Sequence, residues 1–220
     1  MKFVAAAAAA SVIALSANAR ASVEISDNTF NMSDWSHSAH QFGPFGGSGS
    51  IGQTPLGRTG SGLEINNSCG PSFSGVWNAG LYLPFSYNPS AAGVPLTDLT
   101  LSIDSRHTGG LQAVSFVVEQ GGEMWRVGYF INTPSWATYS IMDPMAADIV
   151  PLTAGAMGLP DFSVSGGAIR FGIAAGNSSA GGSGYSTTGY YDNFQVLFVP
   201  SPATLPFGMV AVGLLRRRLR

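Results

Sequence analysis

Apolar and polar residues alternate along much of the chain with a period of two, the pattern of a strand that buries one face. Leu99, Leu101 and Ile103 alternate with polar neighbours, and the runs 169–173 and 194–198 do the same. We expect further strands near 23–30, 63–67, 73–87 and 136–142. Outside the two chain ends no window has a convincing helical period. The pattern therefore predicts an all-β domain.

A hairpin is predicted where two alternating runs meet at Gly121-Gly122. Val114, Phe116 and Val118 share one parity before the glycines, and two alternating runs joined by Gly-Gly are typical of a tight hairpin. After the glycines, alternation from Trp125 to Ile131 predicts that Trp125, Val127, Tyr129 and Ile131 share one face.

Two long stretches are predicted to be loops, because both are rich in Gly and Ser, whose backbone is costly to order. They are residues 41–62 and 175–184. The segment with His37 and His40 is also expected to be a loop, with both histidines on the surface. Many short strands with Gly and Pro turns predict an antiparallel β-sandwich, jelly-roll-like, over residues 22–198.

The N-terminal segment, 1–21, has the layout of a secretory signal peptide. Lys2 supplies the positive start, Phe3 to Ser16 are uncharged and mostly apolar, and small residues follow. Cleavage is expected after Ala19 or Ala21. The alternative is an apolar helix that remains part of the fold.

The C-terminal segment, 199–220, has three blocks in a fixed order. A proline elbow comes first, and since proline lacks a backbone donor we expect it to end the last strand. An uncharged run, 203–215, follows, and as a helix it would span about 20 Å, less than the roughly 30 Å of a bilayer core. The chain ends in arginines, which favour the cytoplasmic side. The elbow and the terminal cluster consist of Val199, Pro200, Ser201, Pro202, Arg216, Arg217, Arg218 and Arg220.

This tail resembles the PEP-CTERM sorting signal of exported bacterial proteins, with Ser201 in place of the glutamate of the family's Pro-Glu-Pro motif. The resemblance covers about the last tenth of the chain. It implies export, transient anchoring in the inner membrane and processing by an exosortase-type enzyme. The processed protein would reach the cell surface or an exopolysaccharide matrix. A short amphipathic tail is the alternative.

Without its two ends the chain is acidic. Residues 22–200 contain four arginines, no lysine and twelve acids, a net charge near −8. Such a surface argues against nucleic acid as a partner, because binding its phosphates requires a positively charged surface. Neutral polysaccharide and divalent cations remain compatible with it. Cys69 is the single cysteine, so no intrachain disulfide can form, and we expect it to act as a small buried hydrophobe.

Asp27 and Asp192 are candidate metal ligands. Each has the parity of its strand's apolar residues, Asp27 with Ile25 and Asp192 with Phe194, and a carboxylate on such a face needs a hydrogen bond, a counter-charge or a metal. Calcium prefers oxygen ligands of this kind. The segment 191–194 also resembles the closing strand of carbohydrate-binding jelly rolls, which implies a structural calcium shared with the first strand. Hydrogen bonds to backbone amides are the alternative, and no other cofactor is expected.

Aromatic residues where strands meet loops suggest a second site, because exposed rings stack on sugar faces. Trp77 and Trp136 are the predicted ligand-binding residues, against the alternative that the tryptophans only pack the core.

Catalysis is not predicted. The chain lacks a G-x-S-x-G elbow, and Glu119 and Glu123 flank the hairpin turn, where carboxylates are usually solvated. The leading hypothesis is a non-catalytic, exported surface or matrix protein. The alternatives are a carbohydrate-binding module and, last, a glycoside hydrolase or lyase on the same scaffold.

Overall fold

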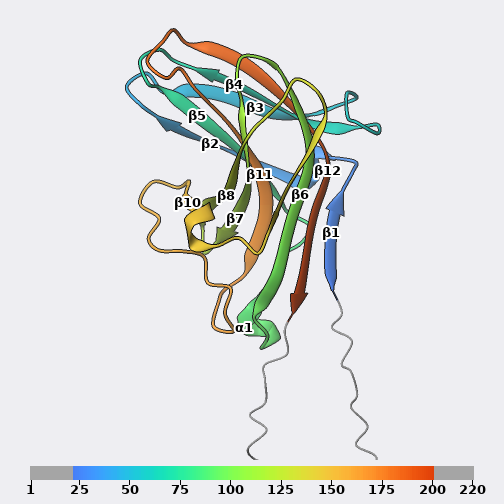
Figure 1. Ribbon diagram of the computed structural model, residues 1–220. Coiled ribbons are helices and arrows are strands. Elements are labelled where there is room, and N and C mark those ends of the chain that lie inside the picture. Colours follow the sequence, from blue (N-terminus) through green and yellow to red (C-terminus); the bar gives the residue numbers. More distant parts are fainter. Residues whose placement is uncertain (1–21, 201–220) are drawn as a thin grey trace, which may run out of the picture.

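The alternating segments pair into two antiparallel sheets that face each other, which confirms the predicted β-sandwich (Figure 1). The computed structural model describes residues 22–200. The predicted signal peptide with Ala19 and Ala21, and the tail from Ser201 through Pro202 to the four arginines, lie outside the described residues.

Each sheet has six strands in the described part of the chain. Sheet A has the order β3-β4-β12-β6-β9, with β1 also paired to β12, and its strands are β1 (Val23–Asp27), β3 (Gly47–Thr54), β4 (Gly62–Cys69), β6 (Leu96–Gly109), β9 (Ala137–Met142) and β12 (Tyr185–Pro200). Sheet B has the order β10-β8-β7-β11-β5-β2, and its strands are β2 (Trp35–Phe42), β5 (Gly75–Tyr82), β7 (Ala113–Gln120), β8 (Glu123–Ile131), β10 (Ile149–Pro151) and β11 (Ile169–Ser178).

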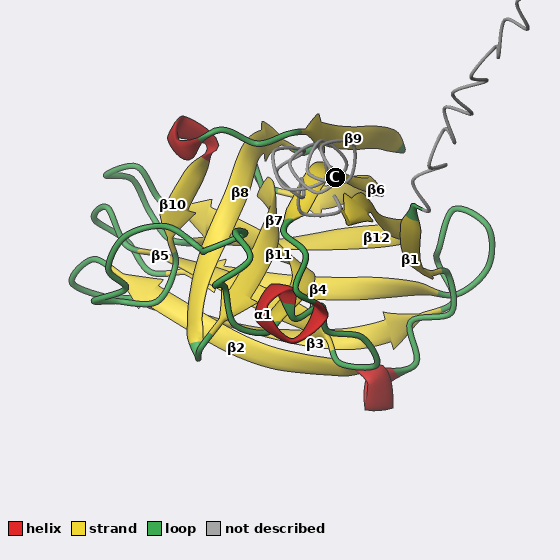
Figure 2. Cartoon of the chain, turned by 90° about the horizontal axis from the view of Figure 1, so that it is seen from below, coloured by secondary structure: helices red, strands yellow, loops and turns green. Residues whose placement is uncertain are grey.

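Helices are limited to short turns between strands in residues 22–200 (Figure 2). They are α1 (Pro89–Ala92) and the 3-10 turns η1 (Met32–Asp34) and η2 (Ala146–Asp148). None of the described helices is long and apolar enough to span a bilayer.

The apolar core fills the space between the sheets. Phe116 and Phe171 project into it from sheet B, and Leu101 and Phe198 from sheet A. Phe198 lies 4.9 Å from the ring of Tyr87, centroid to centroid. Burying each such side chain contributes about 1.5–3 kcal/mol, so stability comes from packing. Cys69 is buried and unpaired, as predicted.

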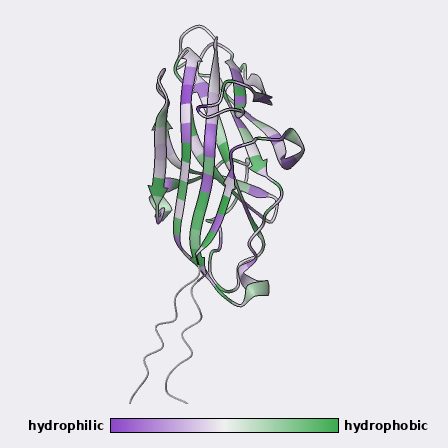
Figure 3. Cartoon of the chain, turned by 90° about the vertical axis from the view of Figure 1, so that its right-hand side faces the viewer, coloured by the Kyte–Doolittle hydropathy of each residue, from purple (hydrophilic) through white to green (hydrophobic). Residues whose placement is uncertain are grey.

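The two ends of the sandwich differ in polarity (Figure 3). The apolar end holds the start of β1 and the end of β12, where Val23 pairs with Phe198. The opposite end holds buried polar side chains, and there Asn78 Nδ2 donates to Asn67 Oδ1 at 2.7 Å.

Three segments that were predicted to be loops form strands or parts of strands. β2 is a strand rather than a loop and pairs with β5 along its whole length. β3 lies within the glycine-rich stretch predicted to be a loop, and β11 continues to Ser178. Gly49 shows why glycine suits β3, because a Cβ there would lie 2.1 Å from Asn66 O and from Asn78 Nδ2. These glycines serve close packing rather than disorder.

The last strand also runs past its predicted end, since Val199 and Pro200 remain in β12 and pair with the start of β6. Proline is tolerated at a strand terminus because little of the hydrogen-bond ladder remains to be lost there.

The predicted hairpin is confirmed, and its second strand contains a bulge. Gly121 and Gly122 have φ of 64° and 87°, as a two-residue hairpin turn requires. Farther along, Val114 pairs with Phe130 but Phe116 pairs with Val127, so β8 holds one extra residue around Gly128. The predicted common face for Trp125, Val127, Tyr129 and Ile131 was therefore wrong. Trp125 and Val127 face the core, and the bulge turns Tyr129 and Ile131 to the outer face.

A second bulge lies at Asn193 in β12, where φ is 51°. The register with β6 shifts between Asp192 and Gln195, so Tyr191 and Phe194 both enter the core although they are an odd number of positions apart. Asp192 consequently projects from the outer face of sheet A beside its pairing partner Asp104. The prediction that it shares the face of Phe194 was therefore wrong.

Candidate ligand-binding cleft

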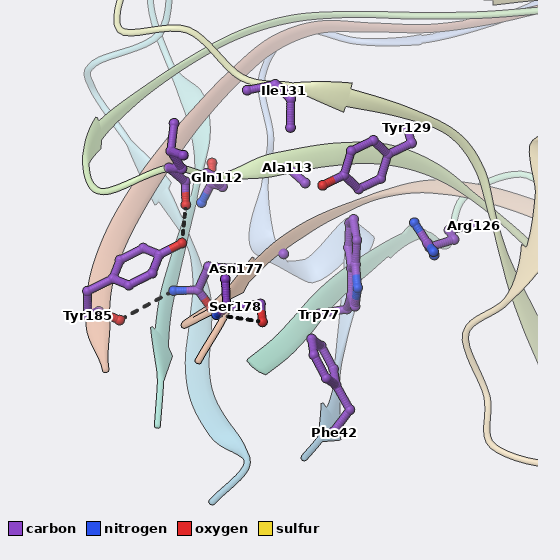
Figure 4. A pocket seen from close by; sticks show the side chains of 13 residues that line it. Phe42, Trp77, Gln112, Ala113, Arg126, Tyr129, Ile131, Asn177, Ser178 and Tyr185 are labelled. Atoms are coloured by element: carbon purple, nitrogen blue, oxygen red, sulfur yellow. Dashed lines mark hydrogen bonds between the residues drawn. The ribbon is translucent and has the colours of Figure 1, made fainter. Parts of the chain in front are cut away.

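A cleft of about 340 Å³ opens on the outer face of sheet B at the polar end of the sandwich (Figure 4). β5, β7, β8 and β11 supply its floor, and the segments before β7 and around Tyr185 supply one wall. The side chains discussed below are Phe42, Trp77, Gln112, Arg126, Tyr129, Asn177 and Tyr185.

Trp77 occupies the centre of the cleft, as Figure 4 shows with the indole seen nearly edge-on. It projects from β5 on the face opposite the buried Val76, which faces sheet A. The ring lies on β11 at Gly176, where a Cβ would come within 2.5 Å of indole Cδ2. Glycine at this position therefore allows the indole to lie flat on the sheet while the side chain stays half-buried.

Tyr129 stands beside Trp77, with ring centroids 6.2 Å apart and planes at 67°. Its side chain is 58% exposed. Tyr129 reaches the cleft only because the β8 bulge turns it outward, so alternation alone predicted the wrong face. Together with Phe42 and Tyr185 it surrounds Trp77 with exposed or half-exposed rings.

Two amide side chains that line the cleft each have one hydrogen-bonding atom without a partner in the described residues. Gln112 is 1% exposed, and its Oε1 accepts from Tyr191 Oη at 2.8 Å and Asn132 Nδ2 at 3.2 Å. Its Nε2 has no partner. Asn177 is 6% exposed and uses only its Nδ2, so Oδ1 is likewise unpartnered. The lining residues thus contain one unpaired donor and one unpaired acceptor, both buried, each costing about 1–3 kcal/mol while unsatisfied.

Arg126 adds a cation. Its guanidinium carbon lies 4.8 Å from the centroid of Trp77 and 5.6 Å from that of Tyr129. Burial lowers the pKa of Arg126, an effect that Tyr129 partly offsets, and an arginine remains charged in proteins. Figure 4 shows Arg126 on one side of the indole and Asn177 and Tyr185 on the other.

His40 pairs with Trp77 across β2 and β5, so it lies on the same outer face. Its Nε2 is 3.0 Å from Ser38 Oγ. Burial, with a smaller contribution from His37, lowers the pKa of His40. His37 instead contacts Asn78 Oδ1 at 2.8 Å. The two histidines therefore have separate surroundings and do not form a joint metal site.

The two tryptophans predicted to bind ligand lie on different sheets. Trp77 is in the cleft, whereas Trp136 precedes β9 and lies by the outer face of sheet A, half-buried. There Arg106 stacks between Trp136 and Tyr190, at 5.4 and 4.8 Å from their centroids. The structure therefore does not bring Trp77 and Trp136 together.

The candidate metal ligands also have separate partners. Asp27 lies on the core side of β1, where its Oδ2 accepts from Trp35 Nε1 at 2.7 Å and its Oδ1 from the amides of Thr29 and Phe30. Burial raises the pKa of Asp27, but these hydrogen bonds outweigh it and the net direction is down. Asp192 Oδ2 accepts from Thr59 N and Oγ1, at 2.7 and 3.0 Å.

The loop between β3 and β4 has a role that the sequence did not predict. Besides Thr59, it carries Arg58, whose Nη1 lies 3.1 Å from Asp104 Oδ2. Asp104 also accepts from Asn193 Nδ2 at 2.7 Å. Within residues 22–200 no group of three or more His, Cys, Asp or Glu side chains is arranged to hold a metal. The calcium site at Asp27 and Asp192 stays a prediction.

Glu119 and Glu123 flank the hairpin turn, as expected, but Glu119 is buried rather than solvated. Glu119 Oε1 accepts from Gly122 N at 2.8 Å, and its Oε2 is 3.6 Å from Arg170 Nη1. Glu119 therefore has a structural role in the turn.

Comparison with known proteins gives similarity in fold. No family model matches the chain, and no curated protein matches it in sequence. A family 11 carbohydrate-binding module from Clostridium thermocellum, solved with a β-1,3-1,4-mixed-linked tetrasaccharide, is 16% identical with a TM-score of 0.47, over 80% of this chain and 94% of the module. A xylan-binding domain from Paenibacillus barcinonensis is 12% identical with a TM-score of 0.39, over 81% and 94%. Similarity at this level assigns neither a family nor a ligand.

Proposed function

We propose that this chain is a non-catalytic carbohydrate-binding protein and that the cleft on sheet B holds a polysaccharide segment against Trp77. The support comes from the cleft itself. Aromatic rings with exposed faces bind the apolar faces of sugar rings, and they lose little conformational entropy in doing so.

The observation that carries the proposal is the aromatic platform itself, in which Trp77 is flanked by the exposed or half-exposed rings of Phe42, Tyr129 and Tyr185. Gln112 and Asn177 add amide groups to the same cleft, each with one atom that has no partner in the described residues. Both atoms are buried, so a sugar hydroxyl, which accepts and donates, reaches them only where the amide side chains turn toward the cleft. Stacking on the rings supports a sugar ligand without these amides.

The position of the cleft agrees with display on a surface. The start of β1 and the end of β12 are paired at the apolar end, and the cleft is at the polar end. If residues 201–220 act as the proposed sorting signal, an anchored domain would present its cleft away from the membrane. Export, processing by an exosortase-type enzyme and location in an exopolysaccharide matrix belong to this proposal and rest on the sequence.

The binding proposal is tested by titrating the domain with soluble polysaccharides that include mixed-linkage β-glucan, xylan and homogalacturonan. Trp77→Ala is expected to weaken binding by about tenfold or more, the effect of losing a central aromatic anchor. Trp136→Ala is the matched control, since it removes an equally half-buried indole from the other sheet. A response that is flat for every polysaccharide, or equal losses in both variants, would contradict the proposal.

Sorting needs its own experiment. Because Val199 and Pro200 belong to β12, the deletion should begin at Ser201 so that the domain stays whole. The truncated protein is expected in the medium and the full chain in the envelope fraction. An identical distribution of the two would count against sorting without affecting the binding proposal.

A further inference from the structure

The charges of the domain are distributed unevenly around the cleft. Residues 22–200 carry twelve acids and four arginines. Of the thirteen residues that line the cleft, none is acidic and one, Arg126, is a cation. The formal charge of the lining is therefore positive, although the domain as a whole is acidic.

Arg126 lacks the carboxylate partner that two other arginines of the domain have. Arg58 has Asp104 as its counter-charge and Arg170 has Glu119. The Arg126 side chain has no carboxylate within salt-bridge distance and no hydrogen bond to another residue in the described part of the chain. Its contacts are with the rings of Trp77 and Tyr129. Stacking holds the guanidinium plane in place and leaves its N–H donors for another group.

A small hollow next to the cleft shares Arg126 and Tyr129 with it. This hollow contains one acid, Asp148, whose Oδ2 accepts from the amide of Met145 at 2.9 Å. Asp148 therefore has a partner of its own in the η2 turn. A polymer chain that stacks one sugar on Trp77 can extend toward the hollow and pass Arg126.

On the basis of the proposed function, we infer that the cleft selects acidic polysaccharides and that Arg126 pairs with the carboxylate of a uronic acid residue next to the sugar stacked on Trp77. A guanidinium edge offers two parallel N–H groups, which match the two oxygens of a planar carboxylate. Desolvation beside two aromatic rings strengthens this pairing relative to one on the open surface.

The test compares polygalacturonate with its fully methyl-esterified form, in which a neutral methyl ester replaces each carboxylate. The wild-type domain is expected to bind the acid form about tenfold more tightly, and Arg126→Gln is expected to remove that preference. Arg106→Gln is the matched control, because Arg106 also stacks on a tryptophan and a tyrosine but lies on sheet A. It should keep the preference.

Three further measurements can contradict the inference. If Arg126→Gln does not fold by circular dichroism, Arg126→Lys replaces it, with an expected partial loss because lysine retains the charge but not the planar fork. A sulfated galactan distinguishes the carboxylate from a sulfate ester, and tighter binding of the sulfated polymer would overturn the uronate assignment. Equal binding of acid and ester forms would overturn the inference while leaving Trp77-dependent carbohydrate binding intact.

Discussion

The indole N–H of Trp35 donates a 2.7 Å hydrogen bond to Asp27 Oδ2 inside the sandwich, joining the edge strand of sheet B to the first strand of sheet A. Both side chains are buried. A buried carboxylate is costly unless its oxygens accept hydrogen bonds, and here both oxygens do. Asp27 therefore stabilises the packing of the two sheets.

Asp27→Asn is expected to lower the free energy of unfolding by about 2 kcal/mol at neutral pH, because hydrogen bonds to a charged acceptor are lost. The pKa of Asp27 lies below its ordinary 3.8, so its contribution is complete above that value and is lost as the pH falls through the native pKa. Urea unfolding at pH 7 and near pH 3 should show the difference between wild type and variant shrinking in acid. Asp143→Asn, in an exposed turn, is the control. A pH-independent difference would refute the role of the charge.

Gly176→Ala is expected to displace the indole of Trp77, since the new Cβ would lie 2.5 Å from its Cδ2. We expect polysaccharide affinity to fall by about tenfold, together with a loss of about 1–3 kcal/mol in stability from overpacking. Titration and thermal unfolding measure the two effects. Gly52→Ala, where no atom lies within 4 Å of the added Cβ, should change neither. Unchanged affinity in Gly176→Ala would show that the position of the indole does not matter for binding.

The β8 bulge is tested by Gly128→Ala. Gly128 has φ of 71°, a conformation that costs a residue with a Cβ about 1–2 kcal/mol. Gly121→Ala carries a comparable strain at φ 64° in the hairpin turn, with open space around the added Cβ. Gly128→Ala should lose somewhat more stability, because its Cβ would also lie 3.0 Å from Phe130 Cε2. Binding should weaken only in Gly128→Ala, because the bulge sets the position of Tyr129. If both variants lost affinity to the same extent, the position of Tyr129 would not matter for binding.

The sequence-based calcium prediction is checked by calorimetry of the domain with calcium or with a chelator. Binding at Asp27 and Asp192 would raise the unfolding temperature in calcium, since a ligand of the native state stabilises it by mass action. Asp27→Asn and Asp192→Asn should then each abolish the increase. Equal unfolding temperatures in calcium and chelator would remove the site.

Alternation along single strands predicted the class of fold, because a strand with one buried face has apolar residues at every second position. Leu99 to Ile103 and the Gly121-Gly122 hairpin are such local features. Trp77 was predicted to bind ligand for a similar reason, since an indole near a strand end, outside the run of core residues, is visible without tertiary information. The acidic body and its single cysteine also follow from the sequence alone.

Only the tertiary structure decided which side chains meet. One extra residue at Gly128 moved Tyr129 to the outer face, and another at Asn193 separated Asp192 from the face of Phe194, because a bulge inverts every position after it. Arg126, Gln112 and Asn177 come from distant parts of the chain and reach Trp77 through the strand order β8-β7-β11-β5. Period-two patterns describe each strand separately. The cleft depends on how the strands pair, and that is fixed by packing between residues far apart in sequence.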